Sequence, residues 1–245
     1  MIDFSWLLDK PIAHRGFWGQ GEGDQPFSAE NSLTAYQRAI DKGYNIEIDV
    51  HLMKDGDFAV FHDGTLTRVC GVPGKVSALT AADLPNYHLS KTEDTIPTLR
   101  QVLDLVDGKV GLLIEMKDFT NRNDCCKKLY EYLKDYKGNY AIQSFNLTVG
   151  GGALGWWRKN TTGIPIGILS CRPLDVLLPS WKNVIKPDFY AFDIKGLPVS
   201  YIEKQRKECG VKLLTWTVRS QDAYDKAVNE VKVDNIIFDT YRLKD

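Results

Sequence analysis

The sequence predicts an α/β fold built from one alternating series of strands and helices. Short β-rich runs recur along the chain, and segments with helical spacing lie between most of them. The 245 residues also match the roughly 250 that a (β/α)8 barrel uses. We therefore expect a TIM barrel with a small insertion after the second strand region. No boundary is visible along the chain, so residues 1–245 are interpreted as a single domain.

The predicted strands number nine, and eight of them would form the barrel. Phe58 to Asp63 is the extra one, expected to form a hairpin with the strand before it. In chain order the runs are Pro11 to Gly16, Tyr44 to His51, Phe58 to Asp63, Lys109 to Lys117, Tyr140 to Phe145, Ile164 to Ser170, Asp188 to Ile194, Val211 to Val218 and Asn235 to Asp239.

The predicted helices lie between these runs. The clearest is Ser32 to Lys42, which carries an apolar stripe and stops at Gly43, a residue suited to a left-handed C-terminal cap. The others are Thr98 to Val106, Asn123 to Tyr136, Leu147 to Asn160, Leu174 to Val184, Ser200 to Cys209 and Gln221 to Val231. Gly64 to Ile96 is too long for an ordinary connection, and such segments tend to be lids or binding loops.

Composition excludes several classes of partner. With 31 basic and 32 acidic side chains the net charge is −1, so the basic surplus typical of nucleic-acid binders is missing. No apolar stretch approaches the ~18 residues of a membrane span, and the first ten residues lack the basic start of a secretory signal. The five cysteines are scattered, which favours reduced thiols. We expect a cytoplasmic protein, whose oligomeric state the sequence does not reveal.

Ionisable residues gather where the predicted strands end. A TIM barrel carries its chemistry at the C-terminal ends of its strands. Alternation places Glu47 and Asp49 on one face of the second strand, and Glu115 closes another strand. Three carboxylates in one barrel mouth would repel each other unless a cation lay among them. Because hard oxygen ligands suit Mg²⁺ or Ca²⁺, we predict a site for one such ion.

Cationic side chains and histidines accompany the carboxylates. Arg15 can direct two donors at phosphate oxygens, and Lys117 can act as a point charge. With a divalent ion, these two cations and the three carboxylates leave a charge of +1, which a phosphodiester balances. His14 and His62 come from different strands and are suited to act as general base and general acid. The pattern therefore predicts a metal-dependent phosphodiesterase.

At these positions the sequence resembles the glycerophosphodiester phosphodiesterase family. The order and spacing of the motifs carry the resemblance, which covers residues 11 to 118 well. The motifs are His14-Arg15-Gly16, Glu30-Asn31, Glu47-Ile48-Asp49-Val50, Lys54-Asp55-Gly56, His62-Asp63, Leu66-Thr67-Arg68, Ile96-Pro97-Thr98-Leu99 and Glu115-Met116-Lys117. Gln143-Ser144-Phe145, Thr215-Trp216-Thr217-Val218 and Asp234-Asn235-Ile236-Ile237 resemble later family signatures less specifically.

The resemblance implies hydrolysis of glycerophosphodiesters to glycerol 3-phosphate and an alcohol, with Mg²⁺ or Ca²⁺ as cofactor. It also implies that residues 64–96 form a small insertion over the active-site mouth. Carried over residue by residue, it implies an acid–base pair of His14 and His62, metal ligands Glu47, Asp49 and Glu115, phosphate contacts Arg15 and Lys117, and pocket aromatics Phe145 and Trp216.

The sequence departs from the family pattern at three positions, and two residues have alternative roles. Ala29 stands where the family usually has Pro, and the final signature has Asn235 and Thr240 in place of its usual Gly and Pro. Glu30 is expected to cap a helix or to orient Arg15, and His51 to pack or to support the metal ligands.

Rival functions are a phosphodiesterase for lysophospholipids or other phosphodiesters, a non-catalytic barrel that binds a phosphate ligand, and an aldolase-type enzyme. The aldolase would use Lys117 as a Schiff-base amine, which requires a lysine without close carboxylates.

Overall fold

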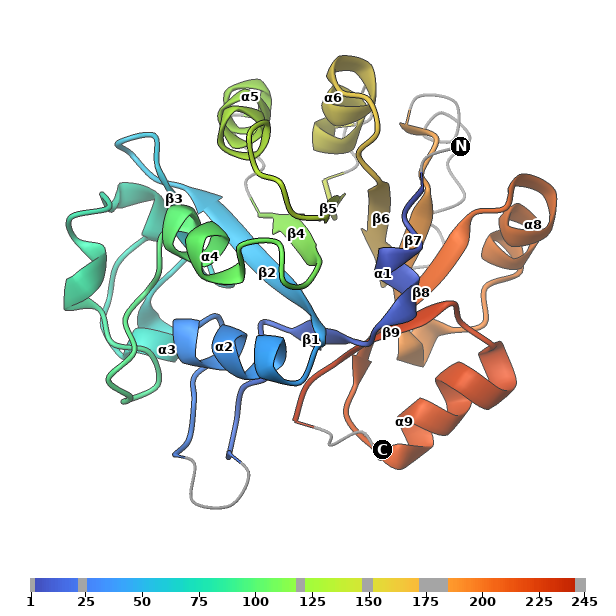
Figure 1. The fold of residues 1–245 in the computed structure, drawn as a ribbon, viewed down its shortest axis with the longest axis horizontal. Coiled ribbons are helices and arrows are strands. Elements are labelled where there is room, and N and C mark those ends of the chain that lie inside the picture. Colours follow the sequence, from blue (N-terminus) through green and yellow to red (C-terminus); the bar gives the residue numbers. More distant parts are fainter. Residues whose placement is uncertain (1–2, 22–25, 118–121, 147–151, 172–184, 241–245) are drawn as a thin grey trace.

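Eight parallel strands close into a barrel, as predicted (Figure 1). The computed structural model describes residues 3–21, 26–117, 122–146, 152–171 and 185–240. The first strand hydrogen-bonds to both the second and the last, which closes the sheet. The barrel strands are β1 (Ile12–His14), β2 (Asn45–Leu52), β4 (Leu112–Met116), β5 (Tyr140–Ser144), β6 (Ile166–Ser170), β7 (Phe189–Asp193), β8 (Lys212–Val218) and β9 (Asn235–Phe238).

The predicted extra strand is β3 (Phe58–Val60). It pairs with β2 in antiparallel fashion, with Val60 opposite Val50. This hairpin extends β2 beyond the barrel wall and leads the chain to His62, which follows the strand. The pairing confirms the predicted hairpin and explains how the second histidine reaches the barrel mouth.

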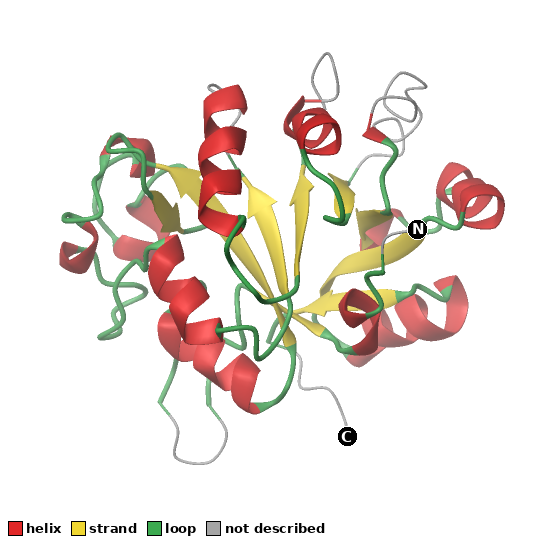
Figure 2. Cartoon of the chain, turned by 45° about the horizontal axis from the view of Figure 1, so that its top comes forward, coloured by secondary structure: helices red, strands yellow, loops and turns green. Residues whose placement is uncertain are grey.

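Helices surround the sheet on its outer side (Figure 2). Ser32 caps the first of them by accepting a hydrogen bond from the Ala35 amide, and Gly43 adopts the predicted left-handed conformation with φ of +68°. The helices are α2 (Leu33–Asp41), α4 (Leu99–Val106), α5 (Arg122–Leu133), α6 (Gly152–Asn160), α8 (Ser200–Cys209) and α9 (Gln221–Asp225), which continues as the π-helical η6 (Lys226–Val231). A 3-10 turn, η5 (Ile194–Gly196), follows β7. The predicted helix from 174 to 184, like the start of the one from 147, lies outside the described residues.

Alternation along the strands separates two hydrophobic clusters. Ile46, Ile48 and Val50 of β2 pack outward with the helices. Ile12, Leu113 and Leu214 belong instead to a smaller cluster inside the barrel. Because successive side chains of a strand point to opposite faces, the positions between the outward residues of β2 face the interior. Glu47 and Asp49 occupy these positions.

A short helix that the sequence analysis did not predict closes the N-terminal end of the barrel. In α1 (Trp6–Asp9), the Leu7 side chain is fully buried in the interior cluster. Asn45 and Asn235, which begin β2 and β9, donate to the carbonyl oxygens of Trp6 and Leu7 at 2.8 and 2.7 Å. This end is therefore filled, and a cavity is left at the opposite, C-terminal end.

Residues 64–96 are more regular than a single loop. They contain α3 (Thr67–Cys70) and the 3-10 turns η1 (Val76–Ala78) and η2 (Leu84–Asn86), and they lie beside β3 at one side of the barrel (Figure 1). Their apolar residues, with Met53 and Phe61 from the flanking chain, form a separate hydrophobic cluster. No helix within the described residues is long and apolar enough to cross a bilayer.

Candidate active site

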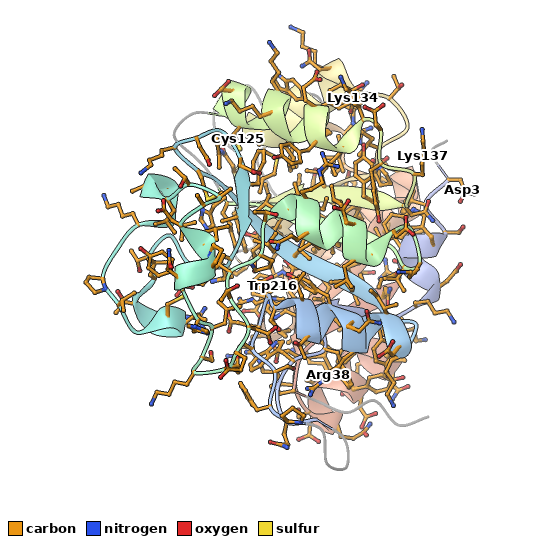
Figure 3. The ribbon with its side chains drawn as sticks, turned by 60° about the vertical axis from the view of Figure 1, so that its left-hand side comes forward. Asp3, Arg38, Cys125, Lys134, Lys137 and Trp216 are labelled. Atoms are coloured by element: carbon orange, nitrogen blue, oxygen red, sulfur yellow. The ribbon has the colours of Figure 1, made fainter. Side chains whose placement is uncertain are left out.

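A cavity of about 290 Å³ opens at the C-terminal ends of the strands. Figure 3 shows Trp216, one of its lining residues, in the middle of the molecule, whereas Lys134 and Lys137 lie at the periphery. Every site residue predicted from the sequence lines this cavity except Asp49, which is fully buried beneath it. The lining includes His14, Arg15, Glu47, His62, Glu115, Lys117, Phe145 and Trp216.

The three predicted metal ligands converge. Glu47 and Asp49 come from β2, and Glu115 lies opposite Asp49 in the register of the neighbouring strand β4. One carboxylate oxygen from each lies within 4.8 Å of the others, and all three residues are buried. Parallel pairing of adjacent strands thus brings together side chains that are 66 to 68 positions apart in the chain.

These carboxylates fit a divalent cation. The Glu47 Oε1 atom is buried and has no hydrogen-bond partner among the described residues. Burial and the charges of Asp49 and Glu115 raise the pKa of Glu47 well above its ordinary value. Burial likewise raises the pKa of Glu115 to about 7, against the lowering effect of Lys117. A hard cation would relieve both the repulsion and the unpaired oxygen, and carboxylate oxygens are the ligands that Mg²⁺ and Ca²⁺ prefer.

The two predicted phosphate-binding cations flank the carboxylates. The Lys117 Nζ atom lies 3.0 Å from Asp49 Oδ1 and 2.7 Å from Glu115 Oε1. Arg15 adopts a left-handed backbone conformation with φ of +60°, and its amide donates to Glu47 Oε2 at 3.1 Å. Burial alone would raise the pKa of Asp49, but Lys117 and Arg15 hold it below its usual range.

Those ion pairs argue against the aldolase alternative. Burial alone would lower the pKa of Lys117, yet Asp49 and Glu115 raise it above the ordinary value. The amine therefore stays protonated, whereas a Schiff-base lysine must give up its proton to attack a carbonyl.

His14, Asp239 and Arg219 form a row of hydrogen-bonded side chains. The His14 Nδ1 atom lies 2.9 Å from Asp239 Oδ2, and Arg219 binds the same carboxylate with two donors at 2.7 and 3.0 Å. Burial would raise the pKa of Asp239, but its hydrogen bonds with His14 and Arg219 lower it to about 2. The carboxylate is therefore ionised and only accepts, so Nδ1 carries the proton and Nε2 is left for chemistry.

His62 has an equivalent arrangement. Its Nδ1 atom lies 2.6 Å from Asp63 Oδ1, and Arg68 binds Asp63 at 2.7 and 2.9 Å. The hydrogen bonds from Arg68 and His62 hold the pKa of Asp63 at about 2. His51 contacts the backbone behind this histidine, with Nε2 3.2 Å from the His62 carbonyl oxygen. This contact places the His51 ring beside the loop that carries His62.

Sequence reasoning did not assign several residues of this site. Asp239 and Arg219 were not proposed at all, and for Glu30 the expectation was either to cap a helix or to orient Arg15. Ser32 is the actual cap, and Glu30 instead accepts a hydrogen bond from Arg15 Nη1 at 2.8 Å. Asn31, its neighbour, donates to Asp49 Oδ2 at 2.9 Å. The Glu30-Asn31 motif was therefore a signal for both contacts.

Two aromatic rings form the apolar part of the cavity. Phe145 and Trp216 meet edge to face, with ring centroids 5.7 Å apart. The indole Nε1 donates to the Ala191 carbonyl oxygen at 2.9 Å, which holds the ring in place at the edge of the cavity. This wall suits the carbon skeleton of a small polyol.

A barrel with clustered carboxylates, flanking cations and two histidines is the arrangement expected of a phosphodiesterase. Comparison with known proteins identifies the family. The model of the glycerophosphoryl diester phosphodiesterase family matches residues 14–149, and this chain belongs to that family. The prediction of a glycerophosphodiester phosphodiesterase is thereby confirmed.

Among similar proteins is a glycerophosphodiester phosphodiesterase of Caldanaerobacter subterraneus, 30% identical, the match covering 93% of each chain. A lysophospholipase D of Mus musculus is 35% identical, over 86% of this chain and 69% of its own.

Solved structures support the fold. An Oleispira antarctica phosphodiesterase, in complex with the product sn-glycerol 3-phosphate, superposes with a TM-score of 0.80 at 23% identity and covers 96% of this chain and 94% of its own. A Parabacteroides distasonis glycerophosphodiester phosphodiesterase superposes with a TM-score of 0.75 at 25% identity, covering 94% and 92%.

Proposed function

We propose that this protein hydrolyses glycerophosphodiesters to glycerol 3-phosphate and an alcohol, in a reaction that depends on one divalent cation and two histidines. The observation that carries the proposal is that His14 and His62 line the same cavity as Glu47 and Glu115. Family membership and the named activity of the Caldanaerobacter relative support the same substrate class.

In the proposed reaction, Arg15 and Lys117 hold the phosphodiester oxygens, and Phe145 and Trp216 contact the glycerol carbons. Glu47, Asp49 and Glu115 would hold Mg²⁺ or Ca²⁺, which would stabilise charge that develops on the phosphoryl oxygens. Asp49 and Glu47 are almost completely buried, so the charged contacts that Lys117 and Arg15 make with them are stronger than they would be in water.

The two histidines move the protons. One accepts a proton from the attacking oxygen, that of water or of the substrate's own glycerol, as the new P–O bond forms, and the other donates a proton to the alcohol oxygen as the old P–O bond breaks. If the glycerol oxygen attacks, a water molecule then opens the cyclic phosphate in a second step, with the roles of the two histidines reversed, and glycerol 3-phosphate is released. Asp239 and Asp63 fix the Nδ1 protons, so both Nε2 atoms are available for these transfers. Burial lowers the pKa of His14 and of His62, so a neutral imidazole is accessible to the one that acts as base.

A lysophospholipid is the second candidate substrate, favoured by the lysophospholipase D relative at 35% identity. The cavity of about 290 Å³ favours the smaller substrate, because it lies at the lower end of the range for small-molecule sites, about 300–1,000 Å³. The non-catalytic alternative is disfavoured because the histidines and carboxylates it would have lost are all in place. A cytoplasmic location remains a prediction from the sequence.

The experiment is a substrate panel with product identification. Purified protein with Mg²⁺ or Ca²⁺ is offered glycerophosphocholine, glycerophosphoethanolamine, glycerophosphoglycerol and lysophosphatidylcholine. We expect glycerol 3-phosphate from the first three. Release of choline from lysophosphatidylcholine alone would move the assignment to the second candidate, and no turnover of any diester would refute the proposal.

A further inference from the structure

The insertion of residues 64–96 approaches the active site without lining its cavity. All of its residues are described, and none is among those around the 290 Å³ cavity. A segment that selected the leaving alcohol by contact would have to reach this space. One side chain of the insertion nevertheless contacts the residues that do line the cavity, and that side chain is Arg68.

Arg68 binds two carboxylates at once. Its guanidinium donates to Glu30 at 2.7 and 2.9 Å and to Asp63 at 2.7 and 2.9 Å. Glu30 also accepts from Arg15 Nη1 at 2.8 Å, and Asp63 lies 2.6 Å from His62 Nδ1. A single guanidinium therefore connects the arginine proposed to hold phosphate with one of the two catalytic histidines.

The insertion fixes the place of Arg68. Arg68 lies on α3. Leu66 and Val69, which lie close to it in the chain, are buried in the hydrophobic cluster of the insertion. Gly71 ends the helix in a left-handed conformation with φ of +73°. The Arg68 side chain is 50% exposed, whereas that of Glu30 is 10% exposed, so the arginine covers the inner carboxylate. The packing of the insertion thus decides where the guanidinium lies.

We propose that the insertion serves this enzyme as a positioning element: through Arg68, Glu30 and Asp63 it holds Arg15 and His62 in their reactive orientations, and it does not select the alcohol by contact. Arg68 is accordingly a positioning residue that touches no substrate. The proposal rests on the proposed function for the identity of the substrate. If the proposal is correct, a change in the insertion alters the rate by the same factor for every head group.

The test compares Arg68→Ala and Arg68→Lys with a control, Lys75→Ala, which removes one positive charge from an exposed position of the same insertion. The kcat and KM values are measured for glycerophosphocholine, glycerophosphoethanolamine, glycerophosphoglycerol and glycerophosphoinositol. We expect Arg68→Ala to lower kcat/KM by about 10- to 100-fold, since small misplacements of reactive groups cost up to that much. The factor should be the same for all four diesters, and Lys75→Ala should match the unsubstituted protein.

The lysine variant separates positioning from stability. A single ammonium cannot bind two carboxylates in forked geometry, so Arg68→Lys should fold normally and still lose most of the rate. The double variant Glu30→Gln with Arg68→Ala should lose no more than the worse single variant, because both changes break one network. Metal affinity, measured by calorimetry, should be unchanged in all of them.

Unequal losses among the four diesters would overturn the proposal, because they would mean that the insertion contacts the alcohol. Losses that multiply in the double variant would also overturn it. The failure of the proposed function looks different, since the unsubstituted protein and Lys75→Ala would then turn over no diester. In that case the inference can still be tested by calorimetry of inorganic phosphate binding in the presence of metal. We expect Arg68→Ala to weaken phosphate binding about tenfold, and an unchanged affinity would refute the inference.

Discussion

Replacement of Asp239 by asparagine tests how far the orientation of His14 supports catalysis. The carboxylate is fully buried, and it accepts from His14 on one side and from Arg219 on the other. An amide has only one acceptor oxygen, and the charged guanidinium will take it. The amide nitrogen then faces His14 Nδ1, which must become an acceptor, so that the imidazole proton moves to Nε2. The ring is left in the wrong tautomer to accept a proton at Nε2.

The expected loss of kcat follows from the role of the His14 ring, and the expected loss of stability follows from the pKa of Asp239. General acid–base catalysis contributes about 10²- to 10⁴-fold, so kcat of Asp239→Asn should fall within that range. The shift of the Asp239 pKa from 3.8 to about 2 corresponds to about 2 kcal/mol of folding free energy. For a chain of this size, that loss lowers Tm by roughly 4–8 °C.

The assay is release of glycerol 3-phosphate from glycerophosphocholine at pH 7, with thermal unfolding followed by circular dichroism. Asp188→Asn is the matched control, because Asp188 pairs with Arg158 at 2.6 Å outside the site. It should lose stability and keep its kcat. If Asp239→Asn kept kcat within about threefold of the unsubstituted protein, the argument from the tautomer would be wrong.

Four further outcomes follow from the same geometry. His14→Ala and His62→Ala should each lower kcat by about 10²-fold or more and leave metal affinity, measured by calorimetry, largely intact; an equal loss of metal binding would make the histidines ligands. A chelator should abolish turnover, and Mg²⁺ or Ca²⁺ should restore it. Metal at a hundred times its Kd should stabilise the fold by about 2.7 kcal/mol in thermal unfolding. Full activity in chelated buffer would show that no metal is required. Trp216→Ala should raise KM for glycerophosphodiesters more than it lowers kcat, and an unchanged KM would remove the ring from the substrate site. Because the folded pKa of Asp239 lies below the unfolded one, its stabilising effect is present above about pH 4 and lost as pH falls toward 2; urea titrations of Asp239→Asn should lack this step, and an unchanged step would assign it elsewhere.

The sequence predicted the parts of the site that depend on strand periodicity. Glu47 and Asp49 alternate with apolar neighbours, so a buried strand had to direct them to the interior face, and Glu115 follows the same rule one strand away. The barrel itself followed from the repeated alternation of strand and helix. Helix ends were predicted where cap residues mark them, as at Ser32 and Gly43.

Contacts between distant loops were beyond the reach of such patterns. Asp239 lies 225 positions from His14, and only closure of the barrel through β9 and β1 brings the two together. Arg68 was part of a recognised motif, yet nothing in its spacing indicates that it binds Glu30 and Asp63 together. Long-range ion pairs depend on loop conformation, which hydrophobic periodicity does not encode.

These ion pairs change the charge balance of the site. The count made from the sequence included three carboxylates, two cations and a metal, and left one positive charge for a phosphodiester. Among the described residues, the connected network also contains Glu30, Asp63 and Asp239 with the arginines Arg68 and Arg219.

Six carboxylates thus face four cationic side chains, so the network carries two net negative charges when all six are ionised, and a bound divalent ion would keep them ionised and make it neutral. A bound phosphodiester then adds one negative charge that the fixed groups leave unmatched. Protonation of one imidazole balances it, and the general acid must hold that proton before the alcohol departs. The extended network therefore gives an electrostatic reason for the proposed protonation of one histidine on substrate binding, although burial lowers the pKa of both in its absence.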